Sequence, residues 1–147
     1  VTNLGAFGVL AALVTPDRQH DDVRDFAGMS KERPGLAALL TLFLLSLGGF
    51  PPTVGFIGKW YIFNAAMQEG LYTLAILGVL TSVVSVFFYL RIVVMMYMSD
   101  ETAAPHRPAV SAITTAGLLI ALAGVLYLGV LPGGLLKIAA ESVASIF

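Results

Sequence analysis

The sequence predicts an all-α membrane protein: a polytopic bundle of transmembrane helices in which one helix is discontinuous. Of its 147 residues, 58% are hydrophobic and 12% are charged, and the mean hydropathy is +0.90. This composition is too apolar for an ordinary soluble domain and is typical of a chain that crosses the bilayer several times. Long apolar runs alternate with short charged segments, and a Gly-Gly-Phe-Pro-Pro sequence at residues 48–52 interrupts one run. That interruption predicts the discontinuous helix.

The first two segments differ sharply in polarity. Residues 1–15 are predicted to be the truncated end of a helix, because the apolar run at 4–15 is shorter than the ~20 residues that a spanning helix needs. Gly5 and Gly8 in this run favour close approach of a neighbouring helix. Residues 16–34 hold about half of the charged residues and are predicted to form an aqueous loop. We therefore expect the chain to be the C-terminal part of a longer membrane subunit.

Residues 35–68 are predicted to form the broken helix. Pro51 and Pro52 cannot donate backbone hydrogen bonds, and Gly48 and Gly49 tolerate irregular backbone. One straight helix over the whole segment would be ~51 Å long at 1.5 Å per residue, well beyond a hydrocarbon core of ~30 Å. Two half-helices joined by an unwound connection fit better. Non-helical backbone at membrane depth is tolerated only inside protein or beside a water-filled cavity, so the break predicts a site or pathway next to it.

Two further spans and a tail complete the chain. Residues 71–98 and 109–131 are each predicted to form a transmembrane helix, and the second carries no charge. Residues 135–147 fit either an interfacial amphipathic helix or a frayed terminus.

The charged loops at 16–34 and 99–108 lie on one side of the membrane if the broken helix crosses once. The opposite side then has only Lys137 as a basic residue. By the positive-inside bias the two loops face the cytoplasm. A re-entrant hairpin would split the basic residues between the two sides, so a single crossing is favoured. The basic residues of the two loops are Arg18, Arg24, Lys31, Arg33 and Arg107.

Lys59 is the only charged residue between Arg33 and Glu69. It lies ten residues before Glu69, or ~15 Å of helix rise, which is too deep for its side chain to reach the far interface comfortably. Two roles remain open and do not exclude each other. Burial disfavours a charged amine, so Lys59 could take up and release protons. Alternatively, carbonyl groups freed at the break could hold it as a permanent cation that locks the two half-helices together.

Other residues of the segments around Lys59 have simpler interpretations. The segment from Gly55 to Trp60 lacks the glycine spacing and the hydroxyl residue of a phosphate-binding loop. Arg91, about two helical turns before the loop at 99–108, is expected to extend its guanidinium to the interface, although it could instead pair inside the bundle and support Lys59. The hydroxyl residues Thr81, Ser82 and Ser85 are expected to hydrogen-bond between helices.

Composition limits the remaining functions. The net charge of −1 gives no electrostatic basis for a nucleic-acid partner. The chain has no cysteine, which excludes disulfides, thiolate catalysis and thiolate-bound clusters. His20 and His106 are not spaced as metal ligands, and the loop carboxylates are expected to be solvated. We expect no catalytic residue and no metal site on this chain.

Four sequence blocks carry a resemblance to a known family. These blocks are Thr-Asn-Leu-Gly-Ala-Phe-Gly at 2–8, Asp-Phe-Ala-Gly-Met at 25–29, the segment from 45 to 59 and Phe-Tyr-Leu-Arg at 88–91. Together they are similar to the C-terminal part of the subunit N family of bacterial NADH-quinone oxidoreductase, the proton-pumping respiratory complex I. The similarity extends from residue 1 to about residue 98. That family in turn resembles subunits of cation/proton antiporters and membrane-bound hydrogenases.

The resemblance implies inverted helical repeats, each with a broken helix near the middle of the membrane. Lys59 matches the lysine on the broken helix of the second repeat, which is thought to serve as a proton relay. The glutamate-lysine pair of the first repeat has no counterpart in this chain. The residues expected to shape the break are Gly48, Gly49, Pro51, Pro52, Gly55 and Gly58.

By the same resemblance, the whole enzyme transfers electrons from NADH through FMN and iron–sulfur clusters to a quinone, and exports protons across the bacterial inner membrane. None of those cofactors is expected on this chain, whose partners would be other membrane subunits, the lipid bilayer and protons. Two alternatives stay open. The chain could belong to a multi-subunit cation/proton antiporter or a membrane-bound hydrogenase, or it could be a purely structural membrane subunit.

Overall fold

A computed structural model describes residues 2–13, 26–99 and 110–134, together with the single positions 137 and 142. The described residues form helices and connections and contain no strand, so the predicted all-helical fold is confirmed for this part of the chain. The helices are α1 (Thr2–Leu13), α2 (Met29–Glu32), α3 (Pro34–Gly48), α4 (Val54–Gln68), α5 (Tyr72–Met98) and α6 (Ala112–Val130).

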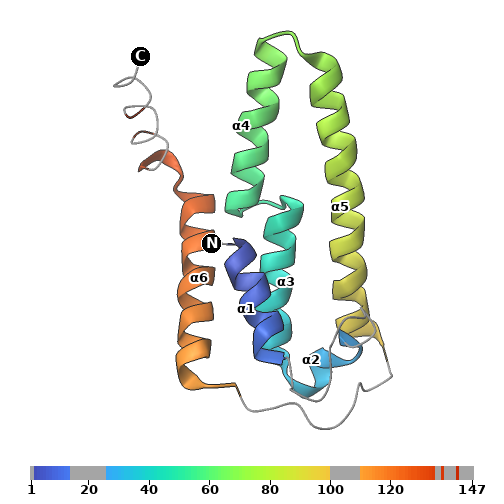
Figure 1. The fold of residues 1–147 in the computed structure, drawn as a ribbon, viewed down its shortest axis with the longest axis vertical. Coiled ribbons are helices and arrows are strands. Elements are labelled where there is room, and N and C mark those ends of the chain that lie inside the picture. The colour runs from blue at the N-terminus through green and yellow to red at the C-terminus, as the bar shows by residue number, and fades with distance from the viewer. Residues whose placement is uncertain (1, 14–25, 100–109, 135–136, 138–141, 143–147) are drawn as a thin grey trace.

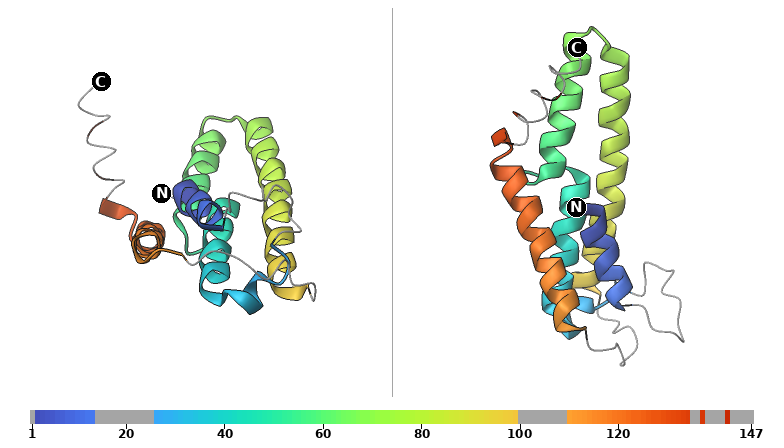
Figure 2. Two further views of the ribbon diagram at one scale, coloured as in Figure 1. Left: turned by 60° about the horizontal axis from the view of Figure 1, so that its bottom comes forward. Right: turned by 60° about the vertical axis from the view of Figure 1, so that its left-hand side comes forward.

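The helices are arranged around α3 (Figure 1). Helix α4 follows α3 in the same direction, and the long α5 returns alongside both of them. Helices α1 and α6 also pack on α3, and Figure 2 shows α6 on the opposite side of α3 from α5. The chain therefore runs onward at residues 49–53 and does not fold back there.

Helix α3 supplies more of the core than any other described helix, whereas α4 has no buried residue among those described. At the centre, the ring of Phe43 is fully buried and occupies the space beside Gly5, where a Cβ atom would overlap it. Gly8 lies similarly close to Leu118 of α6. The two glycines of α1 thus allow the close helix approach that the small-residue pattern predicts. The buried residues of α3 are Leu36, Ala37, Leu39, Leu40, Phe43, Leu44, Ser46 and Gly48.

Part of the predicted aqueous loop is folded. Residues 16–25 lie outside the described part, but residues 26–33 form a turn and the short helix α2, which pack against α3 and α5. Met29 is fully buried, and the Gly28 N–H donates to the Met95 carbonyl at 3.4 Å. The sequence predicted a loop here because most residues of the segment are charged. Met29 is apolar, however, and packs in the core.

Helices α5 and α6 are long and apolar enough to cross a membrane, judged by length and composition. They occupy the two stretches where the sequence predicts continuous spans, and most of their large apolar side chains are exposed on the surface of the bundle. Such a surface suits lipid or further helices rather than water. The loop at 100–109 and nearly all of the tail at 135–147 lie outside the described residues.

Candidate functional site

The connection between α3 and α4 begins where a glycine ends α3. Gly49 has a φ of +86°, in the left-handed region that glycine adopts without a Cβ penalty. The Gly49 N–H donates to the Ser46 carbonyl at 3.1 Å, and the Phe50 N–H donates to the Leu45 carbonyl at 3.0 Å. These two bonds form a Schellman motif, which terminates a helix.

The double proline leaves the Gly48 carbonyl without a helical partner. In a continuous helix that carbonyl would accept from the N–H four residues later, but residue 52 is proline and has none. Lys59 supplies the missing donor, because its Nζ lies 2.9 Å from the Gly48 oxygen. The side chain of Lys59 thus reaches back from the second turn of α4 to the end of α3. A positive charge there is also favoured by the negative end of the α3 dipole.

The contact between Lys59 and Gly48 gives a second reason for glycine at position 49. A Cβ atom at position 49 would lie 2.9 Å from Cδ of Lys59 and 3.4 Å from its Nζ. The lysine side chain therefore passes over a backbone position that has no side chain. This close approach and the positive φ both require glycine at position 49.

Thr53 closes the connection on the α4 side. Its side chain is buried, and its Oγ1 donates to the Phe50 carbonyl at 2.6 Å, while its N–H donates to the same oxygen at 3.1 Å. The Thr53 carbonyl in turn accepts from the N–H groups of Phe56 and Ile57. The sequence prediction did not include Thr53. Its signal was a hydroxyl residue directly before a helical run, the usual N-cap position.

Helices α3 and α4 touch through small residues. A Cβ atom added at Gly55 would overlap the Ser46 carbonyl, so the backbones of α3 and α4 are in close contact there. The Ser46 side chain is fully buried, and its Oγ lies 3.3 Å from Oγ1 of Thr2 on α1. Ser46 was not predicted as a site residue, because no local pattern places a serine of α3 beside the start of α1.

Helix α6 covers the break from another side. A Cβ atom at Gly129 would overlap the Pro52 carbonyl and crowd the backbone of Thr53. On the side of α5, Val86 lies near Gly48. Helix α6 therefore packs on the non-helical connection itself, whereas α1 and α5 contact the last turn of α3 beside it.

The structure brings most of the predicted break residues together, but not all of them. The helix ends, the double proline, Gly55 and Lys59 form one cluster, whereas Gly58 is exposed and a Cβ atom there would meet nothing within 4 Å. Arg91 is exposed on α5, one turn before Met95 at the end of the bundle that carries α2. No described interaction joins Arg91 to Lys59.

The expectation for the hydroxyl residues of α5 was wrong. Thr81 and Ser82 donate to the Gly78 carbonyl, each at 2.9 Å, and Ser85 donates to the Thr81 carbonyl at 3.0 Å. All three bonds stay within α5 and do not join it to another helix. A Ser or Thr hydroxyl in a helix can donate its hydrogen bond to the backbone carbonyl three or four residues earlier, and it then needs no partner on another helix.

The described residues offer no metal centre, since no three His, Cys, Asp or Glu side chains among them lie together as ligands would. What the fold and the site define is a membrane helix bundle with a glycine- and proline-rich break next to a lysine. Residues 1–85 match the family model described as NADH:quinone oxidoreductase/Mrp antiporter, transmembrane. The chain belongs to this family of membrane proteins.

Several relatives are bacterial proteins named NADH-quinone oxidoreductase subunit N. The protein of Bdellovibrio bacteriovorus is 48% identical over 84% of this chain and 25% of its own length. Subunit N 1 of Solibacter usitatus is 42% identical over 98% of this chain and 30% of its own length. The chain thus spans less than a third of the length of these relatives.

A solved structure agrees with the sequence comparisons. A chain in the structure of respiratory complex I from Thermus thermophilus with bound aureothin superposes with a TM-score of 0.74. The two chains are 31% identical, and the match covers 90% of this chain and 31% of the other. The helical arrangement described above is therefore similar to part of a complex I membrane subunit.

Proposed function

We propose that this chain forms part of the membrane subunit through which an NADH-quinone oxidoreductase, respiratory complex I, translocates protons. The family match, the subunit N relatives and the similarity to a chain of the Thermus complex support this assignment. The redox chemistry would take place on other subunits, which would hold NADH, FMN, the iron–sulfur clusters and the quinone. The partners of this chain would be neighbouring membrane subunits, lipids of the bacterial inner membrane and protons.

Within that subunit, α3 and α4 would be the two halves of one discontinuous transmembrane helix. Their common direction and their close contact at Gly55 support this proposal. Each half has 15 residues, or ~22 Å of rise, which is too short to cross a hydrocarbon core of ~30 Å alone. Together they are long enough, and the break then falls inside the membrane.

The single observation that carries the proposed mechanism is the hydrogen bond from Lys59 Nζ to the Gly48 carbonyl at 2.9 Å. Removal from water disfavours the charged amine, whereas the carbonyl and the α3 dipole favour it. A modest change in neighbouring charge can then change the protonation state. A neutral amine keeps two N–H donors, so Lys59 could retain its bond to Gly48 while its lone pair accepts a proton from water.

Arg91 would have a positioning role at the interface. It is exposed near the end of the bundle that carries α2, where its guanidinium can reach water along the membrane surface. The guanidinium would anchor α5 at the interface and take no part in proton transfer.

The test replaces Lys59 in the complete enzyme and measures NADH-quinone turnover together with proton pumping. Lys59→Met removes the titratable group, and Lys59→Arg keeps a donor for Gly48 but stays charged. Both variants are expected to lower coupled turnover at least about a hundredfold, the lower end of what a positioned proton-transfer group typically contributes. Lys31→Met, at the polar end of the bundle, is the matched control and is expected to retain normal turnover.

Normal pumping by both Lys59 variants would contradict the relay role. If Lys59→Arg alone retained full activity, the lysine would be a permanent cation that locks the two half-helices together. The same chain would then be a structural element of the complex.

A second candidate function is supported by the family description, which also names Mrp antiporters. In that case Lys59 would exchange protons against Na⁺ or another cation, in an antiporter or a membrane-bound hydrogenase, without NADH oxidation. Proton movement that required Na⁺ and continued without NADH or a quinone would favour this candidate.

A further inference from the structure

Two hydrogen bonds from neighbouring helices meet in the last turn of α3. On the side of α4, Lys59 Nζ donates to the Gly48 carbonyl at 2.9 Å. On the side of α1, Oγ1 of Thr2 lies 3.3 Å from Oγ of Ser46. Ser46 is fully buried, and Thr2 is partly buried. The same turn of α3 is therefore tied to α4 by one bond and to α1 by the other.

Ser46 differs from other hydroxyl residues of the bundle in the partner that it uses. Thr41, also on α3, donates to the Ala37 carbonyl at 2.7 Å, within its own helix. The hydroxyl residues of α5 bond within α5 in the same way. A fully buried hydroxyl needs a hydrogen-bond partner, and the described partner of Ser46 is Thr2 on α1. The contact thus satisfies a buried hydroxyl and joins two helices.

The packing of α1 makes this short bridge possible and sensitive to distance. The ring of Phe43 occupies the space beside Gly5, so α1 and α3 lie close enough for a serine and a threonine to meet. The oxygen separation of 3.3 Å is longer than the usual range of about 2.5–3.0 Å for a hydroxyl pair. A small shift of α1 toward or away from α3 would therefore strengthen or break the bond.

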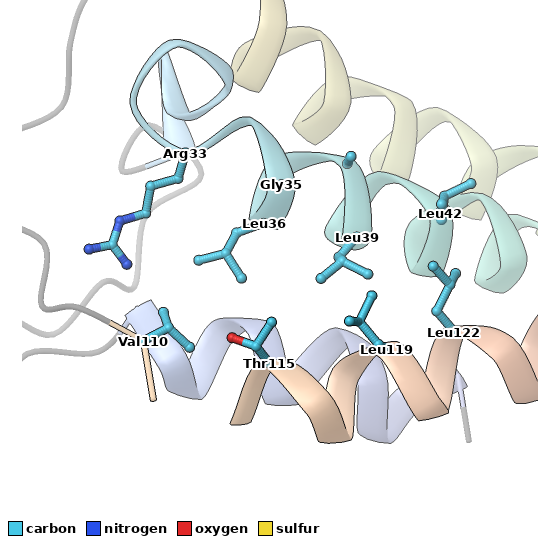
Figure 3. A pocket seen from close by; sticks show the side chains of 10 residues that line it. Arg33, Gly35, Leu36, Leu39, Leu42, Val110, Thr115, Leu119 and Leu122 are labelled. Carbon is cyan, nitrogen blue, oxygen red and sulfur yellow. The ribbon is translucent and has the colours of Figure 1, made fainter. Parts of the chain in front are cut away.

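The side of α3 that faces α6 is different in character. The groove between these helices is lined mainly by leucines, such as Leu39 of α3 and Leu119 of α6 (Figure 3). Among its lining residues the one hydroxyl is that of Thr115, which donates to the Ser111 carbonyl at 3.2 Å. On this side, no described hydroxyl joins the last turn of α3 to its neighbour. The hydroxyl bridge to that turn comes from α1.

The double proline makes the end of α3 dependent on contacts from outside the helix. In a continuous helix the carbonyls of Leu47 and Gly48 would accept from the N–H groups of residues 51 and 52, but both are proline and have none. The helical ladder therefore does not fix the direction of these two carbonyls. Neighbouring elements must hold the turn, and the Ser46 carbonyl also abuts Gly55 of α4.

We propose that Thr2 and Ser46 are positioning residues for Lys59: their hydrogen bond lets α1 hold the last turn of α3 so that the Gly48 carbonyl faces the amine. This inference rests on the proposed function, because it gives α1 a part in the proton relay of Lys59. A movement of α1 would change the bond between the two hydroxyls and, through the last turn of α3, the contact between Lys59 and Gly48. Neither hydroxyl transfers a proton in this role.

The test measures coupled NADH-quinone turnover of the complete complex at equal amounts of assembled enzyme. Ser46→Ala and Thr2→Val each remove one hydroxyl of the pair. Each is expected to lower turnover about fivefold, the change that loss of one ordinary hydrogen bond produces in an equilibrium. The double variant is expected to be no slower than either single variant, because both substitutions delete the same bond. Thr2→Ser keeps the hydroxyl and is expected to retain normal turnover.

Two controls separate positioning of Lys59 from a general effect on packing. Thr41→Val removes a hydroxyl of α3 that bonds within its own helix, and it is expected to turn over normally. Ser46→Ala is also introduced into the Lys59→Met complex, where it is expected to cause no further loss, because Ser46 acts through Lys59. A general effect on packing would lower turnover in both backgrounds.

The outcomes distinguish this inference from the proposed relay. Normal turnover of Ser46→Ala and Thr2→Val, with slow turnover of Lys59→Met, would overturn the positioning role and leave the relay standing. A further fivefold loss when Ser46→Ala is added to Lys59→Met would overturn the positioning role as well. Normal turnover of Lys59→Met would contradict the relay, and the positioning role would fall with it.

Discussion

At the scale of single residues, two features of the structure require glycine at position 49. Its backbone is left-handed, and the Lys59 side chain passes over it. Gly49→Ala is expected to destabilise the purified subunit by about 1–2 kcal/mol from the backbone alone, and to displace Lys59 from the Gly48 carbonyl. Thermal unfolding in detergent measures the change. Gly58→Ala, at an open helical position, is the control and is expected to be neutral or slightly stabilising.

Thr53 offers a second test at this scale. Its buried hydroxyl donates to the Phe50 carbonyl, a bond whose loss costs about 1 kcal/mol. Thr53→Val is therefore expected to lower the free energy of unfolding by about that amount, whereas Thr53→Ser keeps the donor and is expected to lose less. Chemical unfolding of the two variants side by side provides the comparison. A larger loss for Thr53→Ser than for Thr53→Val would assign the role to the methyl group instead.

At the scale of elements, the packing of α6 on the break depends on Gly129. A side chain there would overlap the Pro52 carbonyl, whereas Gly117 on the same helix has open space around it. Gly129→Leu is expected to separate α6 from the connection and to reduce assembly of the subunit several-fold, because overpacking against backbone typically costs 1–3 kcal/mol. Gly117→Leu is expected to assemble normally. Quantitative recovery of the subunit in purified complex measures both.

Local chemistry explains which elements could be predicted from sequence. The end of α3 at Gly48 was predictable because proline and glycine act on the backbone within one turn, and Lys59 stood out because no other charge lies near it in the sequence. Ser46 and Gly129 were not predictable, since their partners, Thr2 on α1 and Pro52 in the connection between α3 and α4, lie far from them in the sequence. Tertiary packing alone reveals such contacts. The predicted spans at 71–98 and 109–131 overlap α5 and α6, because length and hydropathy alone indicate a long apolar helix.

At the scale of the whole molecule, the described helices divide into a packed half and an open half. Helix α3 is surrounded by α1, α5 and α6, whereas α4 contacts α5 and α6 and has no buried residue. Trp60, Tyr61 and Ile62 of α4 are all exposed. An exposed apolar surface of this kind suits lipid or further helices rather than water.

Lys59 is proposed to transfer protons beside the connection between α3 and α4. Its most direct test is the number of protons pumped per NADH oxidised by the assembled Lys59→Arg complex, in which the Gly48 carbonyl keeps a cationic donor but the group no longer titrates. If Lys59 transfers protons, this ratio is lower than in the wild type at equal amounts of assembled enzyme. An unchanged ratio together with unchanged turnover would contradict it.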